Sequence, residues 1–478
     1  MREFIGRSAE YKQFDNFMVS DKAEFLVVYG RRRVGKTFLI KSFFQNKFSF
    51  YISGAENASK EEQLHNFAVA MEKYSNVPYP KVENWTDAFV QLTHYLENVK
   101  TNGRIVVFFD ELPWLDNQKS GFLSAFEYFW NTYASTNDKN FFVFCCSATS
   151  WITNNILKNR GGLHNRVTRQ IHLQPFTLAE TEQFFKSKKI VMSRYQIVEC
   201  YMIFGGIPYY LEQLDKSLGL VQNVDKLLFS HDGALRNEFK EVYYSLFKKP
   251  EKYMKIIEVL SKKRKGITRE DIIKQSKIAD GGSLTRILDE LELCGFIAIN
   301  RNFVTSKRNN LYQLVDFFSL FYLNFVKNQK GFDTNYWSSL TNNAEYRAWS
   351  GYSFELVCQA HITQIKKALS IGGVVSYIAG WRSRCSANNA CTNGAQIDLL
   401  IDRNDNIINI FEIKFSDKKF VITKKYDEVL RNKRGAFIEE TGTKKAVHLT
   451  MLTTYGVERN EYWGNIQSEI TMNDLFIS

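Results

Sequence analysis

Residues 30–37 have the residue types and spacing that bind phosphate. They read Gly-Arg-Arg-Arg-Val-Gly-Lys-Thr, which fits the P-loop pattern G-x-x-x-x-G-K-T. In such a loop the backbone N–H groups surround the phosphates, the lysine reaches the β- and γ-phosphate oxygens, and the threonine hydroxyl binds Mg²⁺. We therefore predict that Lys36 contacts the phosphates of ATP and that Thr37 is a ligand of Mg²⁺.

The residues on either side of this loop supply the elements that it needs. Residues 25–29 form an apolar run typical of a buried strand, and residues 37–44 are long and apolar enough for a helix. A strand, a loop and a helix in this order place the phosphates at the N-terminus of the helix. The alternative is a glycine turn that carries a lysine by chance, and this context argues against it.

A pair of acids ends a second apolar run. Residues 104–111 read Arg-Ile-Val-Val-Phe-Phe-Asp-Glu, the pattern of a buried parallel strand whose last side chains reach the ligand-binding edge of a sheet. We predict that Asp110 holds Mg²⁺ and that Glu111 polarises the attacking water. The alternative is a strand end that is merely acidic.

A third apolar strand, residues 141–146, precedes Ser147, and residues 173–176 are predicted to close the sheet. Ser147 is either a sensor of the γ-phosphate or the N-cap of a helix over residues 150–157. Arg166 lies on the next loop, where an arginine finger would be placed, and it is preferred over Arg160, although either can be a solvated loop charge. The residues predicted to bind the nucleotide are Gly30, Arg31, Arg32, Arg33, Val34, Gly35, Lys36, Thr37, Phe38 and Ser147.

Several motifs in this order resemble those of a known family. They are Phe4-x-Gly6-Arg7, the P-loop, Asp110-Glu111, Ser147, Arg166 and the segment 205–211, Gly-Gly-Ile-Pro-Tyr-Tyr-Leu. The sequence resembles the archaeal-type ATPase family, a branch of the STAND P-loop ATPases. The resemblance implies a winged helix and a nuclease-like domain after the ATPase. Residues 146–149 read Cys-Ser-Ala-Thr, where relatives usually have Gly-Ser-Ser.

The middle of the chain has the order of elements of a winged helix. Three predicted helices precede two short predicted strands: 251–263, 268–277, 283–295, 296–299 and 311–315. The last of these helices carries Arg286 but is otherwise acidic, which is unfavourable for a helix that lies on DNA. The basic run 262–265 is a better phosphate contact, unless it is a solvated loop.

The C-terminal third places two acids and a lysine on predicted strands. Side chains alternate along residues 396–401 and 408–415, so Asp398 shares a face with Gln396, and Glu412 shares a face with Lys414. Two carboxylates that bind Mg²⁺ and a nearby lysine are what metal-dependent phosphodiester cleavage requires. The alternative is an amphipathic hairpin whose polar face is only solvated.

These residues resemble the active-site motif of the PD-(D/E)XK nuclease superfamily. The resemblance makes Asp398, Glu412 and Lys414 the catalytic residues and Glu355, on a helix opened by residues 351–357, an additional metal ligand. The segment 381–384, Trp-Arg-Ser-Arg, lies where the entry to the core would be. Basic residues that could hold a nucleic-acid backbone are Lys418, Lys419, Lys424, Lys425, Arg431, Lys433 and Arg434.

Charge and cysteine usage limit the class of protein further. The formal net charge of +12 and a pI of about 9.1 favour an acidic partner, with DNA the first candidate. The seven cysteines form no C-x-x-C pair and are predicted to be reduced thiols, with a metal or redox role for Cys385 and Cys391 as the alternative. No apolar run approaches the length that spans a membrane, so we predict a cytoplasmic protein with no membrane partner.

The predicted fold class is α/β, with a P-loop ATPase parallel sheet and a helical lid, then a winged helix, then a restriction-endonuclease-like α/β domain. The predicted domains are 1–175, 176–248, 249–316, a helical connector 317–349, and 350–478. The predicted function is ATP hydrolysis coupled to a DNA-engaging domain with Mg²⁺-dependent nuclease chemistry, in a monomer or a homo-oligomer. The alternatives are a nucleotide switch whose last domain binds without cleaving, and a chaperone-like ATPase without nucleic acid.

Overall fold

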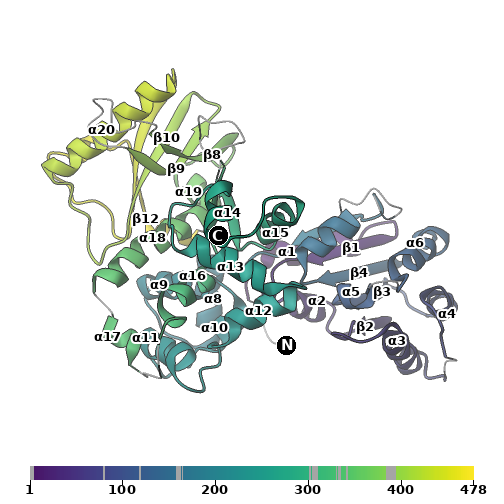
Figure 1. Cartoon of the computed structure of the whole chain (residues 1–478). Helices are drawn as coiled ribbons and strands as arrows, with labels where there is room; N and C mark the ends of the chain where they lie inside the picture. The colour runs from purple at the N-terminus through teal and green to yellow at the C-terminus, as the bar shows by residue number, and fades with distance from the viewer. Residues whose placement is uncertain are drawn as a thin grey trace. The chain divides into compact units, whose positions relative to one another are not determined.

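The computed structural model describes residues 5–78, 81–117, 120–157, 163, 165–300, 303, 310–329, 331, 335–340, 343–383 and 395–477. The chain separates into two compact units, Met1–Pro175 and Phe176–Ser478, which are described here one at a time (Figure 1). Among the described helices, none has the length and apolar character needed to cross a bilayer.

The first unit is built on a five-stranded parallel sheet with the strand order β2-β3-β4-β1-β5. Its strands are β1 (Glu24–Tyr29), β2 (Phe50–Ser53), β3 (Ile105–Asp110), β4 (Asn140–Cys146) and β5 (Arg169–His172). Its α-helices are α1 (Ser8–Met18), α2 (Lys36–Phe43), α3 (Lys60–Ser75), α4 (Trp85–Glu97), α5 (Leu112–Leu115), α6 (Phe122–Thr132) and α7 (Thr149–Ile152), and shorter turns are Ala134–Thr136 and Thr153–Leu157.

Both faces of this sheet are covered, which explains the continuous apolar runs of β1, β3 and β4. On one face Phe25, Phe109 and Phe144 belong to a core cluster that also contains the buried side chains of α3, α4 and α6. On the other face the rings of Phe44 and Phe141 lie 5.8 Å apart. The sheet is therefore a rigid layer whose strand ends are held in place from both sides.

The predicted strands of this unit are confirmed, except at one edge. We expected residues 173–176 to close the sheet, but the edge strand is β5, which ends at His172. The chain leaves the ladder there: the N–H of Leu173 still donates to Tyr29 O at 2.7 Å, but Pro175 follows and cannot donate to a ladder.

The second unit begins with helices and then gives the order of elements predicted for residues 249–316. Its first helices are α8 (Leu178–Lys188), α9 (Arg194–Phe204), α10 (Pro208–Glu212), α11 (Leu220–Val224) and α12 (Glu238–Leu246), with a π-helical turn at Asp225–Phe229. There follow α13 (Pro250–Ser261), α14 (Arg269–Ser276) and α15 (Gly282–Leu293), and the antiparallel strands β6 (Ile297–Asn300) and β7 (Leu311–Leu314). The winged helix remains our interpretation of these elements.

The C-terminal part of this unit is a mixed sheet of order β12-β11-β10-β9-β8, in which β8–β9 and β9–β10 are antiparallel and the other pairs are parallel. Its strands are β8 (Ser376–Arg382), β9 (Gln396–Arg403), β10 (Ile407–Lys414), β11 (Ala446–Thr453) and β12 (Ser468–Thr471). Its helices are α16 (Phe317–Phe321), α17 (Tyr336–Leu340), α18 (Ala344–Ala360), α19 (Ile362–Ala368) and α20 (Lys424–Thr441), with shorter turns at Tyr322–Val326, Trp463–Asn465 and Met472–Phe476.

The helix that carries Glu355 starts earlier than predicted. We expected it to open at residue 351, but α18 begins at Ala344, where the Asn343 side chain accepts a hydrogen bond from Tyr346 N at 2.7 Å. An asparagine N-cap is a stronger start signal than the glycine at 351, which lies inside the helix. The helix therefore runs through the predicted boundary at residue 350.

Strand β10 also differs from the expected pattern of one core face and one polar face. Ile408 and Ile410 share the face of Glu412 and belong to a core cluster with Leu430 and Phe437 of α20. The ring of Phe415, just beyond the strand, lies 5.2 Å from that of Phe354 on α18. Both faces of β10 are therefore covered, and the alternative of a solvated polar face is wrong for Glu412, which is buried.

Two helix-terminal glycines test how closely the backbone is packed. Gly206 (φ +67°) lies where an added Cβ would be 2.3 Å from Phe176 O, whereas Gly442 (φ +61°), after α20, has no atom within 4 Å of that position. Gly442→Ala should cost only the left-handed conformation, about 1–2 kcal/mol. Gly206→Ala should cost clearly more, because the backbone must also move, and urea unfolding of both variants checks this. An equal loss in the two variants would contradict the close packing.

Candidate functional site

The P-loop turns sharply between β1 and α2 and presents the buried side chain of Lys36. Gly30 and Gly35 have φ values of +149° and +89°, and Arg33 is also left-handed at +72°. Lys36 is the first residue of α2, and its Nζ donates to Gly30 O at 3.0 Å and to Arg31 O at 2.9 Å. The loop therefore curls around its own lysine at the N-terminus of the helix.

The surroundings of Lys36 fit a phosphate. Its side chain is 4% exposed, and no carboxylate of the described residues lies within ion-pair distance of Nζ. A buried ammonium without a counter-ion is costly, and the partial positive charge at the start of α2 adds to the uncompensated charge. A bound triphosphate supplies the missing negative charge, so these residues are suited to hold ATP.

The hydroxyl predicted to bind Mg²⁺ contacts the predicted acid directly. Thr37 Oγ1 donates to Asp110 Oδ2 at 2.9 Å and lies 3.1 Å from Oδ1, although β4 separates β1 from β3 in the sheet. Asp110 is buried, and its Oδ1 also accepts a hydrogen bond from Glu111 N at 3.0 Å. A hydroxyl and a carboxylate at one point are oxygen ligands of the kind Mg²⁺ prefers beside phosphates.

Ser147 makes a contact that neither of the two sequence-based alternatives describes. Its Oγ donates to Glu111 Oε1 at 2.8 Å. The N-cap alternative is wrong, since α7 is preceded by Ala148 and has no side-chain cap. Glu111 has a left-handed backbone with φ of +46° at the turn between β3 and α5. The acid predicted to polarise water is thus held by the residue at the end of β4.

Arg7 is a site residue that sequence reasoning did not single out. It is 4% exposed, has a left-handed backbone, and donates from Nη2 to Val34 O at 3.3 Å inside the P-loop. The sequence offered only its place in the Phe-x-Gly-Arg motif, which says nothing of a contact with a loop 27 residues away. Arg7 therefore supports the loop from the segment before α1.

The predicted arginine finger is not brought to the phosphate site by any described contact. Arg166 is exposed on a turn, and its backbone N–H donates to Leu163 O at 3.1 Å. Arg160 lies outside the described residues, as do Arg384, Cys385 and Cys391. The other five cysteines are buried free thiols.

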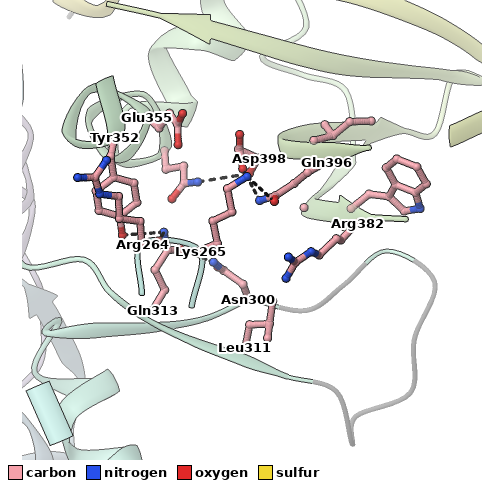
Figure 2. A pocket seen from close by; sticks show the side chains of 14 residues that line it. Arg264, Lys265, Asn300, Leu311, Gln313, Tyr352, Glu355, Arg382, Gln396 and Asp398 are labelled. Atoms are coloured by element: carbon pink, nitrogen blue, oxygen red, sulfur yellow. Dashed lines mark hydrogen bonds between the residues drawn. The ribbon is translucent and has the colours of Figure 1, made fainter. Parts of the chain in front are cut away.

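In the second unit, Glu355 and Asp398 line one pocket (Figure 2). Asp398 Oδ1 accepts a hydrogen bond from Gln396 Nε2 at 2.6 Å, as expected for residues on one strand face. Burial, followed by the negative charge of Asp398, raises the pKa of Glu355 to about 8, although Lys414 opposes the shift. At neutral pH Glu355 is thus largely protonated while no cation is bound beside it.

Glu412 and Lys414 belong to a different cluster, an ion-paired group under α20. Lys433 Nζ donates to Glu412 Oε2 at 2.5 Å, Lys414 Nζ lies 3.0 Å from Oε1, and the Tyr426 hydroxyl also donates to Oε1. Burial by itself raises the pKa of Glu412, but the charges of Lys433 and Lys414 outweigh it and lower the pKa to about 2. The four predicted nuclease residues thus interact electrostatically but do not form a single group.

No three His, Cys, Asp or Glu side chains form a group that could hold a metal ion within the described part of the chain. The predicted ligands Glu355, Asp398 and Glu412 are therefore not arranged as a preformed cage. Of the basic residues predicted to hold a backbone, Lys433 and Arg431 are ion-paired with Glu412 and Asp427. The remaining basic residues are exposed: Lys418, Lys419, Lys424, Lys425 and Arg434.

The parallel sheet, the P-loop and the Thr37–Asp110 contact define a P-loop nucleotide-binding fold. Residues 4–214 match the model of an ATPase domain family described as predominantly from Archaea. This part of the chain is therefore a P-loop ATPase domain of the archaeal type.

The chain is similar to two proteins of Methanocaldococcus jannaschii. The uncharacterized protein MJECL04 is 24% identical over 418 residues, which cover 87% of this chain and 88% of that protein. The uncharacterized ATP-binding protein MJ0423 is 46% identical over 44 residues, which cover 9% of this chain and 75% of that protein.

Similar solved structures include the Walker-type ATPase PABY2304 of Pyrococcus abyssi, with 17% identity and a TM-score of 0.47 over 67% of this chain and 96% of that chain. Another is the ORC2 protein of Aeropyrum pernix, with 12% identity and a TM-score of 0.42 over 76% of this chain and 98% of that chain.

The raised pKa of Glu355 predicts a pH dependence of stability. The folded-state pKa of Glu355 is about 8, above the ordinary value of 4.5, so the folded chain keeps this proton more tightly than the unfolded chain. The contribution of Glu355 to the unfolding free energy is therefore fully present below pH 4.5 and is lost as the pH rises through 8. Glu355→Gln should therefore flatten the fall in unfolding free energy between roughly pH 5 and pH 9. Urea unfolding across this range measures it, with the exposed Glu428→Gln as control. A wild-type profile unchanged by Glu355→Gln would show that Glu355 titrates normally.

Proposed function

We propose that the protein binds and hydrolyses ATP in its first unit, and that the nucleotide state controls a nucleic-acid-binding site in its second unit. One observation carries the first half: the Thr37 hydroxyl contacts the Asp110 carboxylate beside a buried, uncompensated Lys36. This arrangement needs both a metal ion and a phosphate anion to be electrostatically complete.

The roles of the residues follow from their positions. The loop N–H groups and Lys36 bind the phosphates, and Thr37 and Asp110 would hold Mg²⁺, which would offset the charge on the phosphates. Glu111 accepts a hydrogen bond from Ser147, so its carboxylate has one oxygen left to orient a water. Arg166 remains a proposed finger that would act after a movement of its turn or from a second copy of the chain.

Lys36→Ala should weaken ATP binding and hydrolysis at least about a hundredfold, because it removes a buried cation at the N-terminus of α2, where the phosphates would bind. Lys41→Ala is a matched control, since Lys41 lies on the same helix but donates to the Tyr51 hydroxyl at 3.0 Å. Binding of a fluorescent ATP analogue and release of phosphate measure the two effects. Equal activity of wild type and Lys36→Ala would refute the ATPase assignment.

For the second unit we propose DNA binding and, at Glu355 and Asp398, Mg²⁺-dependent phosphodiester cleavage. Two observations support cleavage: Glu355 and Asp398 line one pocket, and Lys414 is near enough for its charge to lower the pKa of Glu355. Exposed basic residues on and beside α20 add positive charge near the same sheet. Cleavage there would need Glu412 to exchange its lysine partner for a metal ion.

That requirement also favours a second candidate, a nucleotide switch whose last domain binds nucleic acid without cutting it. In this case the ion pairs of Glu412 with Lys433 and Lys414 are a permanent part of the core rather than a resting state. Slow ATP turnover with retained nucleotide would accompany it. A chaperone-like ATPase without nucleic acid stays as the third alternative, and DNA binding with a steep salt dependence would exclude it.

Cleavage assays decide between the nuclease and the nucleotide switch. Purified wild type should nick labelled DNA with Mg²⁺ or Mn²⁺, and Asp398→Ala combined with Lys414→Ala should abolish nicking while DNA binding persists. Lys186→Ala, which removes an exposed ion pair with Glu182 on α8, should leave nicking intact. If wild type cuts neither DNA nor RNA with either metal, the switch is the better account.

A further inference from the structure

The pocket that contains Glu355 and Asp398 has a second wall, supplied by the loop between α13 and α14. Arg264 and Lys265 of this loop line it together with Arg382 of β8 (Figure 2). Lys265 Nζ donates to Gln396 Oε1 at 2.6 Å, and Gln396 in turn donates to Asp398. Residues from the predicted middle module and the predicted last domain thus meet in one site.

This loop is held in place by buried polar contacts. The side chain of Gln313, 5% exposed, donates from Nε2 to Arg264 O and to the Tyr352 hydroxyl, both at 3.1 Å. Gly266 follows with φ of +77°, and Ile267 pairs with Tyr312 through two backbone hydrogen bonds of 3.0 and 2.9 Å. The end of the basic run, Arg264 and Lys265, is therefore presented in a fixed position.

The cations of the pocket are not neutralised by ion pairs. Across the described residues, no carboxylate lies within 4.0 Å of the charged nitrogens of Arg264, Lys265 or Arg382. The Arg264 guanidinium instead donates to Ala348 O at 2.7 Å, which orients it without removing its charge. The charge of Lys265 does act on the nearby Glu355, but none of the three cations is held in an ion pair of the described residues. Such cations are suited to an anion that can contact more than one of them.

We propose that Arg264, Lys265 and Arg382 bind a backbone phosphate of DNA at the mouth of the carboxylate pocket. The site is composite, because the α13–α14 loop contributes two of the three cations. This inference rests on the proposed DNA binding of the second unit and names residues that bind the DNA there. It places the DNA contact in the α13–α14 loop rather than on α15, where Arg286 forms an ion pair of 3.7 Å with Glu290.

The basic run itself offers matched controls. Lys262 and Lys263 precede Arg264 in the same loop, carry the same charge and are exposed, but they do not line the pocket. Lys265→Gln and Arg382→Gln are compared with Lys262→Gln and Lys263→Gln in the full chain, with EDTA present so that nothing is cut. Fluorescence anisotropy of a labelled duplex DNA and of one of its strands, over a series of KCl concentrations, measures affinity and its salt dependence.

Lys265→Gln and Arg382→Gln should each raise Kd about three- to tenfold near 0.1 M KCl and lower the slope of log Kd against log salt by about one. The two control variants should change both quantities much less. Equal effects in pocket and control variants, or tighter binding by Lys265→Gln, would overturn the composite site while leaving DNA binding itself established. If wild type binds neither DNA probe, the proposed function of the second unit fails, and this assignment fails with it.

Discussion

The hydrogen bond between Thr37 and Asp110 is the contact on which the account of the first unit depends. It joins residues 73 positions apart, and it can form only because β1 and β3 end at the same edge of a parallel sheet with β4 between them. Tight aromatic packing on both faces holds these strand ends in place. The same edge brings Ser147 to Glu111, so three strand ends contribute to one site.

Two acids of the second unit are stabilised in different ways. Among the described residues no cation is in hydrogen-bond contact with the half-buried Glu355, and its pKa is raised, whereas the buried Glu412 stays ionised because two lysines contact it. A ligand that brings positive charge would change the first arrangement more than the second, since Glu355 has a proton to release. The pocket of Glu355 and Asp398 is therefore the more responsive of the two acidic clusters.

Much of the first unit was predictable because its signals are local. The P-loop spacing and the run that ends in Asp110 each lie within a few residues, and a continuous apolar run identifies a buried strand. What the sequence missed are contacts between distant segments. The contact of Arg7 with Val34 was not predicted, and Ser147 donates to Glu111 rather than capping a helix.

The C-terminal site was harder to predict for the same reason. The alternation of residues along β10 correctly placed Glu412 and Lys414 on one face, but it could not show that α20 covers this face and supplies Lys433. Helix α18 starts at the Asn343 N-cap and not at the glycine at 351. The hydrogen bond from Lys265 to Gln396 joins residues that are 131 positions apart in the sequence. Tertiary contacts of this kind leave no spacing pattern in one sequence.

The most direct test is the effect of Mg²⁺ on ATP binding, measured by calorimetry in wild type and in Thr37→Val, which keeps the shape of the side chain but removes the hydroxyl. If Thr37 and Asp110 form the metal-binding corner of an ATP site, Mg²⁺ should tighten ATP binding at least about tenfold in wild type and have little effect in the variant. An identical response to Mg²⁺ in the two proteins would contradict the account.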